Sequence, residues 1–178
     1  QAVINSFGST ALAGYSAGMR IESLSIVPML AMGNAMSTFT AQNMGAGNID
    51  RVKKGYQMCY VIVLTAGAVL CVMYQLAGGA FVSLFLDSGS SEAYSVGLSY
   101  VKFLSFFYSF IGLKASTDGL LRGAGDVTAF TVANLVNLAI RVSVTNLFAP
   151  IYGIQVAWMA VPLGWAANYV ISFGWYLT

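Results

Sequence analysis

Charged residues are scarce in this chain, and histidine is absent from it. Only 8% of the 178 residues are charged, against about a quarter in an ordinary globular domain. Without histidine the chain lacks the commonest general base and metal ligand. Its two cysteines, Cys59 and Cys71, lie in one apolar segment, where thiols act as small hydrophobes. The sequence therefore indicates no enzyme, no cofactor and no nucleic-acid partner, and it identifies no metal site.

Long apolar segments are what the chain has instead of charge. The windows 23–49, 55–86 and 142–178 contain no charged residue, and each exceeds the roughly twenty residues that a helix needs to cross the hydrocarbon of a bilayer. This pattern predicts an all-α polytopic membrane protein with a single helical domain, located in a plasma membrane such as the inner membrane of a bacterium. The expected elements are a partial helix over 1–8 and five spans over about 21–44, 52–86, 94–121, 127–149 and 154–178. The sequence begins within an apolar segment rather than before one. We therefore expect a fragment with a truncated first helix.

Basic residues predict the orientation of these spans. Lys and Arg near span ends favour the cytoplasmic side of a membrane, whereas acidic residues contribute little. Arg51, Lys53 and Lys54 therefore place the loop 42–55 in the cytoplasm. The loops after it alternate outside, inside and outside. Arg20 falls on the outer side against this rule, and a local pair with Glu22 would reduce its effect.

Two loops of similar composition lie on the predicted cytoplasmic side. In the first, Gly45 and Gly47 are expected to end a helix and Asp50 to cap the next one. In the second, Gly123 and Gly125 play the same part, and the following acid, Asp126, caps the next helix. These glycines are candidate hinges or caps. Pro28 is a further candidate, because its missing amide donor kinks the helix that contains it.

Polar residues inside the spans are the candidates for function, because ionisable groups at membrane depth are costly and by default mark a pathway or a buried pair. Asn134, Asn137, Arg141 and Thr145 fall at helical spacing and form one polar stripe. This stripe is either the wall of a cavity that meets substrate or coupling ion, or a set of interhelical hydrogen bonds, with the second alternative favoured.

A second polar face carries Lys114, Asp118 and Arg122 at successive i,i+4 steps. A self-compensating ladder is the simplest interpretation, and a proton- or cation-responsive carboxylate at Asp118 is the sharper hypothesis. Asn34, which follows Pro28 in the first span, marks a third polar place. The candidates for substrate binding or ion coupling are therefore Asn34, Asp118, Asn137 and Arg141.

Several motifs in order give the chain a resemblance to a known family. They are AGYSA at 13–17, a span with a central Pro28 that ends in AQNMGAG before DRVKKG, LLRGAGD at 120–126, Arg141 in the next span, and AVPLGW at 160–165. Together they resemble the second half, helices seven to twelve, of a transporter of the multidrug and toxic compound extrusion (MATE) family. The chain would then be one six-helix lobe of a twelve-helix fold.

The resemblance implies an antiporter that exports organic cations, drugs or other amphiphilic molecules across the membrane by alternating access, driven by sodium or protons. It implies membrane lipids and the missing N-terminal lobe as partners. A coupling carboxylate of the family lies in that other lobe. The acid that its sodium-coupled branch has in the tenth helix corresponds to Ile111 here, and the related acid of the seventh helix would precede Gln1. A flippase for lipid-linked sugars of the same superfamily and a non-transporting membrane scaffold are the alternatives.

Overall fold

The computed structural model describes residues 8–86 and 91–177 and is helical throughout these ranges, apart from short connections. The predicted partial helix over 1–8 lies almost wholly outside the described residues, as does part of the connection before 91. The helices are α2 (Ser9–Gly45), α3 (Ile49–Val82), α4 (Ser91–Ser105), α5 (Tyr108–Gly123), α6 (Val127–Tyr152) and α7 (Gln155–Tyr176).

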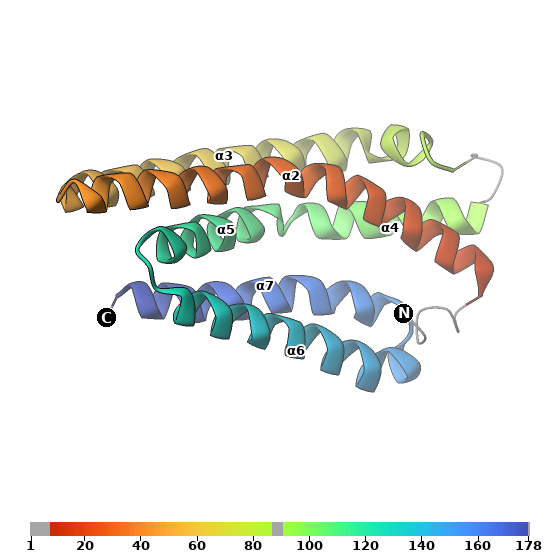
Figure 1. The fold of residues 1–178 in the computed structure, drawn as a ribbon. Coiled ribbons are helices and arrows are strands. Elements are labelled where there is room, and N and C mark those ends of the chain that lie inside the picture. The colour runs from red at the N-terminus through yellow and green to blue at the C-terminus, as the bar shows by residue number, and fades with distance from the viewer. Residues whose placement is uncertain (1–7, 87–90, 178) are drawn as a thin grey trace.

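The described helices have the length and composition of membrane spans. Four of them, α2, α3, α6 and α7, are each long and apolar enough to cross a bilayer, and α4 with α5 forms a fifth candidate that is bent by 53°. In Figure 1, α2 and α3 lie on one side, α6 and α7 lie on the other, and α4 and α5 run between them. The α2–α3 turn, the α5–α6 turn and the end of α7 lie at the same end of the bundle. This is an all-α polytopic membrane protein, as predicted.

The observed helix bounds correct two of the predicted spans. α2 begins at Ser9 rather than near 21, because Arg20 and Glu22 do not interrupt it. Two residues apart on a helix point about 200° apart, so Arg20 is exposed and Glu22 is buried. The predicted span 94–121 is broken between α4 and α5, where Phe107 has φ −106° and ψ 1°, a turn conformation that needs no proline. The other bounds differ from prediction by a few residues, within the usual uncertainty of helix ends.

The two glycine loops end their helices as expected, but with one glycine each in the left-handed region. These are Gly47 with φ +72° and Gly125 with φ +87°, whereas Gly45 and Gly123 are the last helical residues of α2 and α5. Asp126 caps α6, since its Oδ1 accepts a hydrogen bond of 3.0 Å from the Ala129 backbone. The predicted Asp50 cap is wrong: Asn48 holds the N-cap position of α3 and Asp50 lies in its first turn.

The backbones of α2 and α5 approach each other closely through small residues. A Cβ atom added at Gly119 would overlap the carbonyl oxygen of Gly33, and one added at Gly123 would overlap the carbonyl oxygen of Ser37. Small residues at such spacing are the usual means of close helix packing in membranes. This contact fixes α5 against α2 and so positions the polar face of α5 toward α6 and α7.

Candidate functional site

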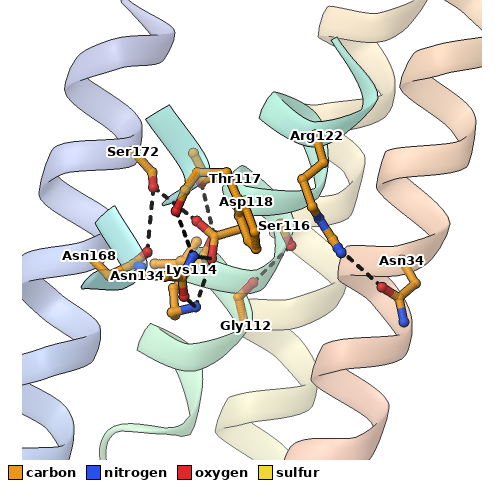
Figure 2. Close-up of polar contacts among 12 residues, drawn as sticks. Asn34, Gly112, Lys114, Ser116, Thr117, Asp118, Arg122, Asn134, Asn168 and Ser172 are labelled. Carbon is orange, nitrogen blue, oxygen red and sulfur yellow. Dashed lines mark hydrogen bonds and ion pairs between the residues drawn. The ribbon is translucent and has the colours of Figure 1, made fainter. Parts of the chain in front are cut away.

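Asp118 lies at the centre of a buried polar network that joins α5, α6 and α7 (Figure 2). Its Oδ2 is 2.7 Å from Lys114 Nζ and accepts a hydrogen bond of 3.2 Å from Asn134 Nδ2. Lys114 Nζ also donates to Asn134 Oδ1 over 3.0 Å. On the other side, Ser172 Oγ donates to Asp118 Oδ1 over 2.9 Å. Both carboxylate oxygens and the ammonium group therefore have partners within the protein, as a self-compensating pair requires.

Arg122, the third member of the predicted ladder, is directed elsewhere. Its Nη2 donates to Asn34 Oδ1 over 3.1 Å, and its guanidinium lies 5.1 Å from the centre of the Phe130 ring. Figure 2 shows this contact on the side of α5 away from Asp118. Asn34 is an exposed residue of α2. Its hydrogen bond from Arg122 links α2 to α5. Pro28 is exposed within the continuous α2.

A separate cluster of hydroxyl groups, built on Thr117 beside Asp118, joins α5 to α3 and α7. Thr117 Oγ1 lies 2.7 Å from the Tyr56 hydroxyl and 3.0 Å from the Tyr60 hydroxyl. These two tyrosines also contact each other, and Tyr60 donates to the Tyr169 hydroxyl on α7 over 3.2 Å. Sequence reasoning missed this cluster. The i,i+4 spacing of Tyr56 and Tyr60 is the signal that indicates a shared polar face.

Glu22 is a second buried carboxylate that sequence reasoning missed as a site. Tyr100 of α4 donates a hydrogen bond to its Oε2, so the predicted pair of Glu22 with Arg20 is wrong. The Tyr100 ring meets Tyr15 and Trp158 edge-on, with centroid distances of 5.3 Å and 5.6 Å. Among residues 8–86 and 91–177, neither this acid nor Asp118 belongs to a group of ligands that could hold a metal ion.

The predicted polar stripe of α6 divides among three environments. Asn134 belongs to the Asp118 network. Asn137 faces Gly164 of α7, and its buried Oδ1 has no partner among the described residues. Arg141 and Thr145 line a cavity of about 330 Å³ together with Tyr15 of α2. Asn134 therefore makes the interhelical hydrogen bonds of the second alternative, whereas Arg141 and Thr145 line a cavity, whose contact with substrate or coupling ion stays a prediction.

The structure also shows two apolar cavities away from these polar groups. One, of about 200 Å³, lies between α2 and α3 beside Met32 and Met36. The other, of about 280 Å³, lies beside Phe107 and Phe110 at the bend between α4 and α5, against Pro162 of α7. Either could accept an apolar group.

Comparison with known proteins identifies the family. The MatE family model matches residues 1–160. The probable multidrug resistance protein YpnP of Bacillus subtilis is 30% identical over 148 residues, which are 83% of this chain and 33% of that protein. The inward-facing structure of a multidrug resistance MATE transporter covers 97% of this chain and 39% of its own, with a TM-score of 0.88 at 18% identity. A MATE structure in the bent conformation gives a TM-score of 0.86 with the same coverage and identity.

These matches also define how much of such a protein is present. The chain spans about a third of the length of the curated relative, and its folded helices have the shape of one lobe of the solved transporters. The motifs 13–17, 120–126 and 160–165, which carried the resemblance, lie on or beside helices α2, α5 and α7. The chain belongs to the MatE family of multi-pass membrane transporters.

Proposed function

We propose that this chain is the C-terminal lobe of a cation-coupled antiporter that exports drugs, organic cations and other amphiphilic molecules across the plasma membrane. The observation that carries the proposal is the family membership together with the name of the relative, a probable multidrug resistance protein. The rest of the parent chain would supply the other lobe, and membrane lipids would surround both. The apolar cavities beside Met32 and Phe107 suit the apolar parts of varied substrates.

Alternating access in this proposal comes from movement between lobes. The lobe superposes with nearly equal scores on MATE structures named as inward-facing and as bent. It contains the Lys114–Asp118 ion pair of 2.7 Å, and its helices α2 and α5 pack through glycines. Such a unit resists internal rearrangement, so we infer that it moves as one body against its partner lobe.

Sodium or proton coupling needs a carboxylate whose occupancy shifts the balance between the two states. The described spans offer two buried acids, Glu22 and Asp118. Asp118 is neutralised by Lys114, whereas Glu22 has one hydrogen bond, from Tyr100, and no ion pair within the described residues. Ile111, at the position expected for a family acid, is apolar and buried. We therefore propose coupling through the other lobe, with Glu22 and Asp118 as the acids of this lobe to test.

The test is efflux of a fluorescent organic cation by cells that carry the full-length parent protein. The sodium and proton gradients are collapsed separately, and Glu22→Gln, Asp118→Asn and the exposed control Asp50→Asn are compared at equal expression. Loss of efflux with one gradient identifies the coupling ion. A selective loss in Glu22→Gln or Asp118→Asn gives that acid a role in coupling. No efflux of any dye under any gradient contradicts the antiporter proposal.

A flippase for lipid-linked sugars is the second candidate, and the cavity of Arg141 favours it. That guanidinium is exposed on the lobe and has no hydrogen-bond partner among the described residues, as would suit a phosphate-bearing substrate. Transfer of a fluorescent lipid-linked sugar across proteoliposomes that contain the parent protein, without efflux of organic cations, would favour this candidate.

A further inference from the structure

We propose that the cavity beside Arg141 binds the anionic group, a carboxylate or phosphate, of an amphiphilic substrate. This inference rests on the proposed transport function and adds a substrate feature to it. The cavity has a volume of about 330 Å³ and is bounded by α2, α6 and α7. Since drug-sized pockets run from about 300 to 1,000 Å³, it has room for a charged head group or a single ring and leaves the rest of an amphiphile outside.

Gly164 of α7 sets the position of the guanidinium. A Cβ atom at this residue would lie 2.9 Å from Arg141 Cγ and 3.2 Å from Arg141 Cδ, which is closer than ordinary carbon contacts allow. The aliphatic stem of Arg141 therefore lies flat against the α7 backbone, in a space that only glycine leaves open. The charged end continues past this contact to the cavity that Arg141 lines.

The polar groups of the cavity can donate hydrogen bonds. Arg141 carries a permanent charge and a fork of N–H donors that matches carboxylate and phosphate. Tyr15 and Thr145 line the same cavity, and the hydroxyl group of neither has a hydrogen-bond partner in the described ranges. The Asn146 side-chain Nδ2 donates one hydrogen bond of 2.9 Å to the Val142 carbonyl oxygen of its own helix. A carboxylate or phosphate would accept from these donors, whereas an ammonium group would be repelled.

One internal anion acts on this site. Glu22 is close enough to interact electrostatically with Arg141, yet it forms no ion pair with it, and its Oε2 accepts from Tyr100 instead. Glu22 therefore weakens the positive potential of Arg141 in the cavity. The guanidinium N–H donors still have no hydrogen-bond partner among the described residues. Leu138 and Val142 complete the wall with apolar surface, which suits the hydrophobic part that adjoins an anionic head.

The test compares two dyes that differ only in the anionic group: a rhodamine with a free benzoate and its methyl ester, which is a lipophilic cation. Binding of each to the purified full-length parent is measured by fluorescence polarisation, for the native protein, Arg141→Gln and Gly164→Ala. Arg20→Gln, which removes an exposed arginine outside this cavity, is the matched control. We expect Arg141→Gln to weaken binding of the free acid at least tenfold and to leave the ester and the control unchanged.

Nanodiscs with and without phosphatidylglycerol distinguish the two sources of the anion. If this lipid weakens binding of the free acid to native protein but not to Arg141→Gln, the site also accepts a lipid phosphate. If it has no effect, the site prefers the substrate carboxylate. Equal affinities of acid and ester in native protein, or equal losses for both dyes in Arg141→Gln, would overturn the inference. Efflux of the ester is followed in the same proteins, so that a failure of transport is distinguished from a failure of the anion site.

Discussion

Two glycines at equivalent places, the last residues of α2 and α5, are expected to respond differently to the same change. Gly45 is the last residue of α2, and Gly123 is the last residue of α5. A Cβ atom at Gly45 meets nothing within 4 Å, whereas one at Gly123 would overlap the Ser37 carbonyl oxygen and lie 2.7 Å from Thr40 Cβ. Gly123→Ala should therefore destabilise the lobe, and Gly45→Ala should not.

The size of the difference follows from this geometry. Ordinary carbon contacts lie at about 3.5–4.0 Å, so the substitution at Gly123 forces α5 and α2 apart locally by about 1 Å. Such overpacking costs about 1–3 kcal/mol, and we expect the upper half of this range because a helix carbonyl cannot rotate away. The gain in helix preference from glycine to alanine, up to about 1 kcal/mol, applies to both variants and cancels in their comparison.

The measurement is reversible unfolding of the detergent-purified parent protein in increasing denaturant, with the monodisperse fraction after heating as a second readout. Gly45→Ala should match or slightly exceed the native protein in stability, and Gly123→Ala should fall below it by about 2 kcal/mol. Substrate affinity measured in the folded fraction should change in neither variant. Equal stability of the two variants would refute the close α2–α5 contact.

Three further predictions concern the buried polar groups and the second turn. Lys114→Met should cost about 3–5 kcal/mol, because it leaves Asp118 buried without its cation, and adding Asp118→Asn should recover most of this loss in the same unfolding assay; additive losses would contradict the pairing. Tyr100→Phe should cost about 1–3 kcal/mol by leaving the Glu22 carboxylate without its donor, and an unchanged melting temperature would argue against that bond. Gly125→Ala should cost about 1–2 kcal/mol, because φ is +87° at this turn, with Gly125→Asn less costly in the same melts.

The membrane spans could be predicted from the sequence because hydrocarbon thickness alone sets their minimum length. The windows 55–86 and 142–178 allow few other placements, since nothing charged interrupts them. The turn at Gly125 could be predicted for a similar reason: glycine followed by a capping acid is a local signal, and both partners of the cap, Asp126 and Ala129, lie within one turn. Features that depend on residues close together in the sequence could therefore be predicted.

Contacts between distant segments could not be predicted in the same way. Glu22 pairs with Tyr100, 78 residues away, and nothing near either residue indicates the other; the charged neighbour Arg20 suggested a pair that helix geometry forbids. The break between α4 and α5 carries no proline or glycine at its centre, so no local signal marked it. Only part of the Asp118 network could be predicted. Lys114 lies one turn away on the same helix, whereas Ser172 comes from α7.

Some charged groups of this lobe have all their partners within it, and others do not. A buried charge within a lobe must keep its partners through every state of transport, because losing them in a low-dielectric interior costs several kcal/mol. Lys114, Asp118 and Ser172 meet this requirement wholly within the lobe. Arg141 differs from them, because it is an exposed residue whose stem packs against Gly164 and which lines a cavity. A ligand or the partner lobe that binds such an unpaired charge changes the energy of one state relative to another, which is why we propose Arg141, rather than the network around Asp118, as the ligand-binding residue of this lobe.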